Sequence, residues 1–538
     1  MTKQKHIKAV DAASNAEELL PLEQMMVQGG APNEGAAYAV DDANQDKDSE
    51  HHGTESKGAS LVPKLRFAGF TESWRSVYLK DVVTSFEYGL NAPAKDYDFF
   101  TKYLRITDID EDSRKFLITD LKSPDIEAAK ASDYLAQDGD LFFARTASVG
   151  RTYLYSRSDG RVVFAGYLIR GHVRQDLFSP VFIFYSTLTT QYEMFVAATS
   201  ARSVQPGINA AEYGSYQFAV PSIAEQQRIG SLFKELDHNI ELNRGLLEKL
   251  TQLKKSMLEQ MFPREGESLP RLRFAGFTEP WRKSDLGEIS NTITEEAHNH
   301  PDLLPIEQTI SQVCTTYEVA VRAVDDTHQF KDSEHQGIEG EGSSLLPKLP
   351  DGWKWVQLKD LGEIMTGTTP PMLSGRKLQG VLPLITPAEI SGSFNGIEAK
   401  RWFLQENKAK AKTVPADTVL MVCIGSVGRC SLADREVGFN QQINAVIVDN
   451  SVASPAFVLA AFMSPLFKSQ LSDKTNCTLI PILNLSTWGD LYVPLPSLAE
   501  QQRIGEFFKA LDQRITQQRA KVEKLGHLKK ALLEQMFV

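Results

Sequence analysis

At residues 221–262 the chain reads PSIAEQQRIGSLFKELDHNIELNRGLLEKLTQLKKSMLEQMF, and at 496–537 it reads PSLAEQQRIGEFFKALDQRITQQRAKVEKLGHLKKALLEQMF. The two stretches match at 26 of 42 positions without a gap. A match of this length at a fixed offset marks an internal repeat. The 538-residue chain is therefore a tandem duplication.

Each stretch is predicted to form one long helix. Ser222 and Ser497 are suitable N-caps, and Glu225 and Glu500 follow three residues later, as in a capping box. Neither stretch contains a proline beyond its first residue. A helix of about 40 residues spans roughly 60 Å, which is longer than one domain of this size requires.

The apolar residues of both helices follow the 4-3 spacing of a coiled coil. The first seam contains Ile229, Phe233, Leu236, Ile240, Leu247 and Leu250, and the second contains Ile504, Phe508, Leu511, Ile515, Val522 and Leu525. Polar residues interrupt both seams at matching places, first at Asn243 and Gln518, then at Lys254 and Lys529. Because polar seam residues fix register, we expect the helices to pair with each other, antiparallel, as a spacer. The alternative is that each helix packs only on its own domain.

Shorter motifs repeat as well. LRFAGFTE, followed by Trp two residues later, begins at Leu65 and again at Leu272, and a diverged form, LPKLPDGWKW, begins at Leu346. The chain then divides into an acidic lead (1–60), a first domain with its LRFAGF segment (61–219), helix 1 (220–263), a duplicated LRFAGF segment with an acidic insert (264–345), a second domain (346–494) and helix 2 (495–538). The helices are nearly identical and the two domains that precede them differ in sequence. This indicates that the two halves work in the same way but bind different ligands.

The net charge of −11 is unevenly distributed. Residues 1–60 carry a net charge of −6 and residues 288–345 a net charge of −10, which leaves +5 for the rest of the chain. A mildly basic body of this kind suits a phosphate-bearing partner, although the charge alone is weak support. The two acidic segments are predicted to be largely disordered. The alternative is a small acidic domain, since LLPLEQMM and LLPIEQTI could each start a short helix.

Other sequence features favour a cytoplasmic protein without metal or cofactor. No apolar run reaches the roughly 18–20 residues of a membrane span, and the N-terminal stretch lacks the apolar core of a signal peptide. The four cysteines form no CxxC pair and no zinc spacing.

The first variable region contains an arginine-rich turn. GDLFFARTASVGRTYLY, at 139–155, predicts two strands around a turn that carries Arg145, Thr146, Ser148 and Arg151. Between Leu141 and Gln205 there are seven Arg and no Lys, and a guanidinium can bind guanine or phosphate bidentately. Gln205 and Asn209 are of the type that pairs with adenine. The alternative is that both amides satisfy turn backbone.

The repeats and turns together resemble the specificity subunits of type I restriction-modification systems. The resemblance is carried by the paired AEQQRIG helices ending in MLEQMF or LLEQMF, the LRFAGF segments and motifs in both variable regions. It implies two mixed α/β target-recognition domains held apart by an antiparallel helical pair, each reading half of a split, asymmetric DNA site. One departure is the acidic insert, which lies between two copies of the LRFAGF segment.

The resemblance also implies partners. Two methyltransferase (modification) subunits would dock on the helices and LRFAGF segments, and restriction (translocase-nuclease) subunits would join them. S-adenosylmethionine, ATP and Mg would bind those partners only.

The second variable region has matching landmarks. MTGTTPP, with Thr368 and Thr369, resembles the family's Gly-Thr-Thr-Pro turn. VCIGSVGRCSL, at 422–432, is the counterpart of ARTASVGRTYL, with Ser426 and Arg429 at matching positions. The remaining candidate contacts are Asn440 and Gln441 in GFNQQINAV, and Lys474 and Asn476 in KTNCTLIPILN. About half of the amides in GFNQQINAV are expected to form an internal hydrogen-bonded layer instead.

Motifs of catalysis are missing from the sequence. It has no GxxxxGK[ST] phosphate loop, and no Asn-Pro-Pro-aromatic motif of the kind that amino-methyltransferases use. We therefore expect a non-catalytic DNA-recognition subunit. The alternative is a coiled-coil scaffold with two protein-binding domains.

Overall fold

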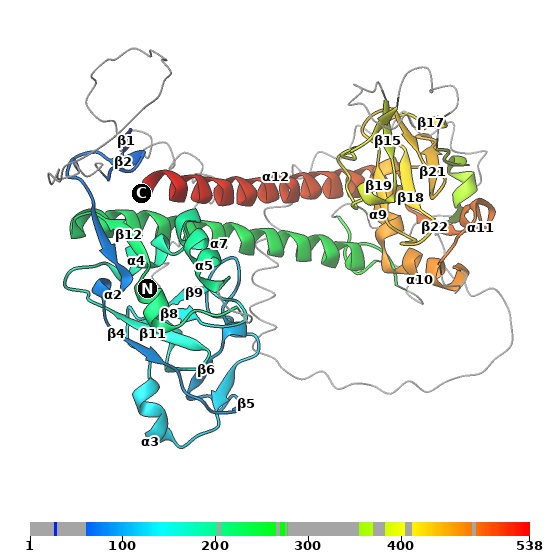
Figure 1. Cartoon of the computed structure of the whole chain (residues 1–538). Coiled ribbons are helices and arrows are strands. Elements are labelled where there is room, and N and C mark those ends of the chain that lie inside the picture. The colour runs from blue at the N-terminus through cyan, green and yellow to red at the C-terminus, as the bar shows by residue number, and fades with distance from the viewer. Residues whose placement is uncertain are drawn as a thin grey trace, which may run out of the picture. The chain divides into compact units, whose positions relative to one another are not determined.

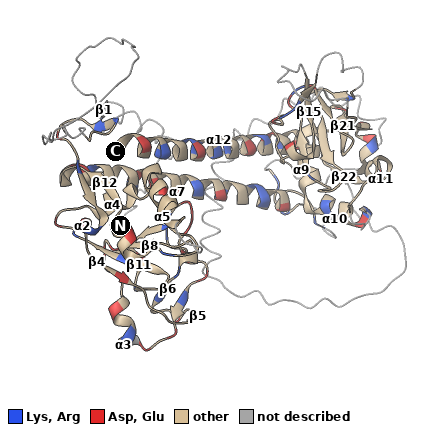
Figure 2. Cartoon of the chain, in the orientation of Figure 1, with Lys and Arg blue, Asp and Glu red and all other residues tan. Residues whose placement is uncertain are grey.

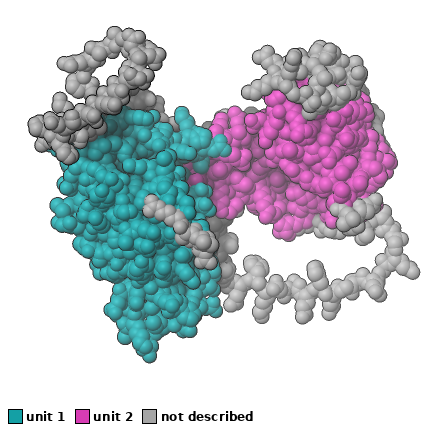
Figure 3. All heavy atoms as spheres, in the orientation of Figure 1, with its two compact units in different colours: residues 1–242, 522–538 teal, residues 243–521 magenta. Residues whose placement is uncertain are grey.

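The computed structural model describes residues 61–201, 206–264, 270–274, 277, 354–369, 382–403, 411–475 and 480–538, together with the backbone of 26–28. They belong to two compact units (Figure 3): unit 1 consists of Met1–Leu242 and Val522–Val538, and unit 2 of Asn243–Lys521. The predictions for the two acidic segments fall outside the described residues, apart from the backbone of β1 (Met26–Gln28). Gln205 and Asn476 also lie outside them.

Unit 1 is built around a four-stranded antiparallel sheet (Figure 1). Its strands lie in the order β4 (Val83–Tyr88), β11 (Leu168–Val173), β8 (Leu141–Ala144) and β9 (Thr152–Leu154). Two-stranded sheets surround it: β6 (Lys102–Leu104) with β10 (Val162–Phe164), β5 (Ala94–Asp96) with β7 (Lys122–Pro124), β3 (Arg75–Tyr78) with β12 (Gln217–Val220), and β1 with β2 (Leu65–Phe67). The short helices are α2 (Leu79–Val82), α3 (Ala128–Ala131), α4 (Pro180–Ser186), α5 (Thr190–Ser200) and α6 (Ala210–Gly214).

Unit 2 repeats this plan. Its main sheet has the order β14 (Gly362–Thr366), β21 (Ile443–Val448), β18 (Val419–Val422) and β19 (Cys430–Leu432). A second sheet contains β16 (Trp402–Phe403), β15 (Leu382–Ile385), β20 (Val437–Phe439) and β17 (Thr413–Val414), and β13 (Lys354–Gln357) pairs with β22 (Tyr492–Leu495). The short helices are α9 (Pro455–Met463), α10 (Pro465–Lys474) and α11 (Leu485–Gly489). The sequence prediction of mixed α/β domains in tandem is therefore confirmed.

The long helices α7 (Ile223–Gln260) and α12 (Leu498–Met536) both contribute to each unit. Ten of the twelve seam residues are buried, and Leu247 and Val522 are half-buried. In unit 1 the ring of Phe233 contacts that of Phe537, and Asp237 pairs with Lys529 at 2.6 Å. As the numbers rise along α7 they fall along α12, so the two helices pack antiparallel within each unit, as expected.

The polar seam residues pair across the helices of unit 2. The Gln518 amide donates to both the carbonyl and the side-chain oxygen of Asn243, at 2.9 Å each. Lys254 Nζ lies 2.5 Å from Asp512 Oδ1. Because each interruption has a polar partner on the opposite helix, a shift of one helix along the other would break these pairs and leave polar groups unpaired. These pairs therefore fix the helix register.

The AEQQRIG motif holds each domain onto its helix. Glu225 accepts two hydrogen bonds from Arg66 in the LRFAGF segment, at 2.7 and 2.8 Å, and both side chains are buried. Glu500 accepts the same two bonds from Arg273, at 2.8 and 2.7 Å. Besides their predicted place in a capping box, the two glutamates therefore fix the LRFAGF segments.

The glutamine and glycine of this motif contact the starts of the short helices α4 and α9. The Gln226 side chain accepts from the backbone N–H of Ser179 at 2.9 Å, and the Gln501 side chain accepts from that of Ser454 at 3.1 Å. A Cβ added at Gly505 would lie 2.9 Å from the Cβ of Ala456 in α9. Glycine inside a helix costs about 1 kcal/mol relative to alanine, and the close approach of α9 to α12 explains why it is present here.

The duplicated LRFAGF segment at Leu272 supplies the partner for α12. Arg273 and Phe274 pack on α12, and the ring of Phe274 lies 5.8 Å from that of Phe507. The strand that follows, β13, comes from the other side of the acidic insert and occupies the place that β3 has in unit 1. Unit 2 thus uses both copies of the interrupted segment.

None of the helices in the described ranges combines the length and the apolar content of a membrane span.

Candidate nucleic-acid interface

The turn predicted from the sequence joins β8 to β9 and is here called turn 1 (residues 144–151). Its ends are closed by hydrogen bonds from Gly150 N–H to the carbonyl of Ala144 and from Ala144 N–H to that of Arg151, at 3.3 and 2.8 Å. The backbone of Arg145 donates to Tyr167 and accepts from Ile208, at 3.0 Å each. Two neighbouring segments therefore hold the main chain of Arg145 in place.

Turn 2 (residues 422–429) joins β18 to β19 in the same way. Gly428 N–H donates to Val422 O at 3.0 Å, and Val422 N–H donates to Arg429 O at 2.8 Å. Cys423 takes the place of Arg145: its backbone donates to Gln442 at 2.8 Å and accepts from Leu483 at 2.9 Å. Turns 1 and 2 therefore correspond residue by residue.

Both turns require a residue in the left-handed backbone region. Ala147 has φ +58° in turn 1, and Gly425 has φ +84° at the corresponding place in turn 2. Left-handed backbone is unfavourable for a residue with a Cβ. Turn 1 therefore holds a strained alanine where turn 2 has a glycine, at the most exposed part of the turn.

The arginines that end the turns have an internal partner. Arg151 Nη1 donates to the carbonyl of Ile109 at 2.9 Å, and Arg429 donates to the carbonyl of Ile390. Each carbonyl directly follows a 3₁₀ turn, Ile106–Asp108 or Pro387–Glu389. A guanidinium has five donors, so this bond leaves others available. It nevertheless gives both residues a structural role that the sequence did not indicate.

The other candidate residues of the two turns are at least partly accessible. Arg145, Thr146 and Ser148 are half-buried, and Ser426 and Arg429 are exposed. Arg145 lies over the ring of Tyr88, with its guanidinium carbon 4.9 Å from the ring centroid. Tyr88 and Tyr167 are 44% and 67% exposed, and sequence reasoning missed both.

Asn209 acts as the N-cap of α6. Its side-chain oxygen accepts from Glu212 N–H at 2.9 Å, and Glu212 accepts from Asn209 N–H at 2.8 Å. In unit 2 the side-chain oxygen of Asn484 caps α11 by accepting from Thr487 N–H at 2.8 Å. The interpretation of Asn209 as a turn residue, left open by the sequence, thus has a structural basis.

The Gly-Thr-Thr segment of unit 2 lies against GFNQQINAV (438–446), which contains the end of β20, a turn and the start of β21. A Cβ added at Gly367 would lie 2.3 Å from the carbonyl oxygen of Phe439, so only glycine fits there. Thr369 donates to the side chain of Gln441, and both residues are exposed. Thr368 accepts a hydrogen bond from Lys412 N–H at 3.0 Å.

The amides of the 438–446 segment divide into two groups. Asn440 is only 8% exposed, and its amide donates to the Gln442 side chain at 3.0 Å. Asn444 is buried and accepts from Thr366 at 2.7 Å. Gln441 is exposed, as is Lys474 at the end of α10. An internal amide layer therefore exists, and Asn440 belongs to it.

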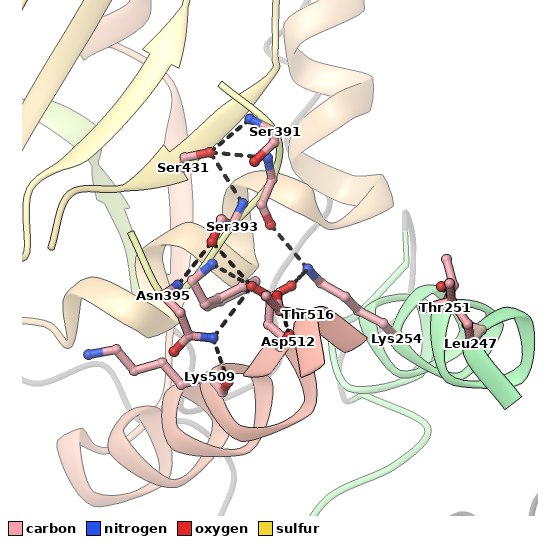
Figure 4. A network of polar contacts seen from close by, with 12 residues as sticks. Leu247, Thr251, Lys254, Ser391, Ser393, Asn395, Ser431, Lys509, Asp512 and Thr516 are labelled. Atoms are coloured by element: carbon pink, nitrogen blue, oxygen red, sulfur yellow. Dashed lines mark hydrogen bonds and ion pairs between the residues drawn. The ribbon is translucent and has the colours of Figure 1, made fainter. Parts of the chain in front are cut away.

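A polar network connects turn 2 to α12 (Figure 4). Asp512 accepts from Phe394 N–H at 2.9 Å and pairs with Lys254, which donates to Gly392 O at 3.0 Å. The same loop donates three backbone N–H groups, from Ser391 to Ser393, to the buried hydroxyl of Ser431. Ser431 lies in β19, which begins directly after turn 2.

Unit 1 connects turn 1 to α7 through side chains instead. Asp237 accepts from the hydroxyl of Tyr185 in α4 at 2.8 Å and pairs with Lys529. At the end of α4, the Thr187 hydroxyl bonds that of Thr152 at 2.7 Å, and Thr152 is the residue after turn 1. Each turn is thus fixed to a carboxylate at the same position of its long helix.

Comparison with known proteins adds family information. A family model described as the type I restriction modification DNA specificity domain matches residues 71–252 and 350–524. The chain is similar to the type I restriction enzyme HindI specificity subunit of Haemophilus influenzae, with 22% identity over 426 residues, covering 75% of this chain and 86% of that protein. It is also similar to the MjaIX specificity subunit of Methanocaldococcus jannaschii, with 25% identity over 197 residues, which is 36% of this chain and 45% of that protein.

A solved structure shares the fold. The S subunit of a type I restriction-modification system from M. genitalium aligns with a TM-score of 0.51 at 13% identity, covering 89% of this chain and 99% of that one.

Proposed function

The chain belongs to the type I restriction modification DNA specificity family, and from this premise we propose that each of its two units reads one half of a bipartite, asymmetric DNA site. In this proposal the chain is the DNA sequence-recognition subunit of a type I restriction-modification complex. Turns 1 and 2 are the proposed contact elements, and their accessible polar side chains include Arg145, Thr146, Ser148, Ser426 and Arg429. Thr369, Gln441 and Lys474 are proposed contacts beside turn 2.

The observation that carries this proposal is the relation between the two turns. Four main-chain hydrogen bonds of turn 1 have a counterpart in turn 2, whereas Arg145 and Thr146 of turn 1 are replaced by Cys423 and Ile424 in turn 2. A recognition protein needs this combination, because phosphate and backbone contacts position the protein while a few side chains read the bases. A scaffold that binds two proteins has no need of a common turn in both domains.

The long helices are proposed as the spacer and docking surface. Both charge signs occur along α7 and α12 (Figure 2), which suits a protein partner. Two methyltransferase subunits would bind there and would bring the catalytic groups, and restriction subunits would join them. In this proposal adenine-N6 methylation and ATP-dependent cleavage occur in the partners, and S-adenosylmethionine, ATP and Mg bind to them.

The test is an electrophoretic mobility-shift titration of the chain together with its methyltransferase partner on a library of duplexes. We expect sequence-selective binding whose logarithmic affinity falls linearly with the logarithm of salt concentration. The methyltransferase alone, over the same salt range, is the control. If adding the chain creates no sequence selectivity, the proposed function is wrong.

A further inference from the structure

Arg145 in turn 1 is a positive charge held on an aromatic ring. Its guanidinium carbon lies 4.9 Å from the centroid of the Tyr88 ring. Among the residues that the structure describes, no carboxylate forms an ion pair with it. The guanidinium group is planar, and stacking on a ring leaves its N–H edges open to a ligand.

The sheet register places a second tyrosine beside this arginine. β11 pairs with β8 so that Leu168 lies opposite Ala144, and just beyond this pair Arg145 N–H donates to the carbonyl of Tyr167 at 3.0 Å. Ile169, two residues further, lies opposite Tyr88. The Arg145 guanidinium lies over the Tyr88 ring and its main chain is bonded to that of Tyr167, so the three residues lie together at the end of the sheet. We call these three residues the Tyr–Arg–Tyr cluster.

The cluster is held rigidly although it is open to solvent. Both carbonyl and N–H of Arg145 are hydrogen-bonded to neighbouring segments. The Tyr88 hydroxyl accepts from Ala210 N–H at 3.2 Å. A Cβ added at Gly89 would lie 2.1 Å from the carbonyl oxygen of Ala165, so the backbone after Tyr88 is closely packed. The main chain of Arg145 and the tyrosine beneath its guanidinium are therefore held in place before any ligand binds.

Unit 2 has no such cluster. Cys423 stands in the place of Arg145, is 2% exposed, and burial raises the pKa of its thiol to about 12. By the same register, Thr366 stands in the place of Tyr88, and the backbone bond of Gln442 matches that of Tyr167. A function of the Tyr–Arg–Tyr cluster therefore belongs to unit 1 alone.

We infer that the Tyr–Arg–Tyr cluster reads a guanine in the half-site of unit 1, with Arg145 donating two hydrogen bonds to its N7 and O6 atoms in the major groove. Tyr88 fixes the plane of the guanidinium, and Tyr167 contacts the neighbouring base pair. Bidentate pairing of arginine with guanine is the commonest specific side-chain contact to a base. A phosphate contact needs neither a fixed plane nor a second exposed ring. The inference rests on the proposed function of unit 1 as a DNA reader.

The test uses the complex of the chain with its methyltransferase partner, and maps modified sites in a randomised plasmid library by single-molecule sequencing. The variants are Arg145→Ala, Arg145→Lys and Tyr88→Leu. Arg157→Ala is the matched control, since Arg157 is exposed in the same unit and lies outside the cluster. The half-site of unit 2 serves as an internal measure of folding and assembly.

For Arg145→Ala we expect one guanine position in the half-site of unit 1 to lose about 5- to 150-fold in discrimination, with the half-site of unit 2 unchanged. Arg145→Lys keeps the charge but not the planar fork, so it should relax the same position while the salt slope stays the same. Tyr88→Leu should relax that position less, and Arg157→Ala should change nothing.

Two results would overturn the inference and leave the proposed function standing. One is a uniform loss of modification at all sites with Arg145→Ala, with a salt slope lower by about one unit and recovery in Arg145→Lys, which identifies a phosphate contact. The other is a half-site of unit 1 that contains no guanine. If the complex with the unsubstituted chain shows no sequence selectivity, the proposed function itself is refuted.

Discussion

Turn 1 and turn 2 share four main-chain hydrogen bonds, whereas some of their accessible side chains differ. In turn 1 an arginine lies on a tyrosine ring, and in turn 2 the corresponding residue is a buried cysteine. The identical parts are those that support the turn, such as the closing glycine bond and the arginine that reaches a distant carbonyl. The comparison teaches that the residues that stabilise the turn and the residues proposed to contact DNA bases occupy different positions of the same turn.

The connections from the turns to the long helices show a similar division. Asp237 and Asp512 occupy the same place in the repeat, and each pairs with a seam lysine of the other helix. Asp237 accepts from a tyrosine hydroxyl, whereas Asp512 accepts from the backbone of a loop. The carboxylate is kept in both units, and the group that it binds differs with the domain.

The largest effect is expected from exchanging a whole reader. Replacing residues 78–219 with the corresponding region of another family member should replace one half-site completely and leave the other intact, because the supporting helices and LRFAGF segments stay the same. Mapping of modified sites measures the outcome. A change in both half-sites, or in neither, would show that the units do not read independently.

The next largest effect should come from the buried ion pairs at the start of the long helices. Glu225→Ala leaves Arg66 buried without its partner, and we expect a loss of about 3–5 kcal/mol in the free energy of unfolding. Glu500→Ala should cost less, because Arg273 is 14% exposed whereas Arg66 is 5% exposed. Urea unfolding of the full chain measures both. The double replacement of Arg66 by Met and Glu225 by Leu is the control, and it should recover most of the loss. Equal losses in the two single variants would contradict the burial argument.

For Asp237 and Asp512, the loss in the free energy of unfolding should be larger in unit 2 than in unit 1, the reverse of the order expected for the two glutamates. Asp512→Asn should lower the free energy of unfolding by about 2–3 kcal/mol and Asp237→Asn by about 1–2 kcal/mol, because an amide no longer compensates the charge of the seam lysine. The side chain of Asp512 is 9% exposed and binds a loop as well as Lys254, whereas that of Asp237 is 21% exposed. Thermal unfolding measures the difference. A larger loss in Asp237→Asn would mean that the loop contacts of Asp512 contribute little.

Much of this framework was predictable from the sequence. The repeat, the 4-3 seam and its polar interruptions predict the helix pair, because apolar spacing is a local property. The aspartates that pair with Lys254 and Lys529 were not predicted, because they lie beside the seam and their partners are on another helix.

The site was only partly predictable for a related reason. The arginine excess marked Arg145 and Arg151, but Tyr88 and Tyr167 meet Arg145 only through sheet register. Likewise, nothing in the sequence near Arg151 points to the carbonyl of Ile109, which lies in a distant segment. A signal for Tyr88 was nevertheless available. Tyr88-Gly89 corresponds to Thr366-Gly367, and Gly367 is the first residue of the Gly-Thr-Thr-Pro turn.

The smallest effect concerns the arginines that end the turns. Arg151→Met and Arg429→Met keep an unbranched side chain and remove the hydrogen bond to Ile109 or Ile390. We expect a loss of about 1 kcal/mol in the free energy of unfolding for each, the contribution of one hydrogen bond. Thermal unfolding, with Arg157→Met as the control in unit 1, measures this effect.

The same two variants decide how the arginines act on DNA. If Arg151 supports turn 1 through the Ile109 carbonyl, its loss lets the turn move, so discrimination in one half-site falls while the salt slope of binding stays constant. If Arg151 contacts a phosphate, discrimination stays and the salt slope falls by about one unit. The internal bond and the 14% exposure of Arg151 favour support. Arg429, which has the same bond but is exposed, is the sharper case: a reduced salt slope for Arg429→Met alone would show that the two turns share an arginine but use it differently.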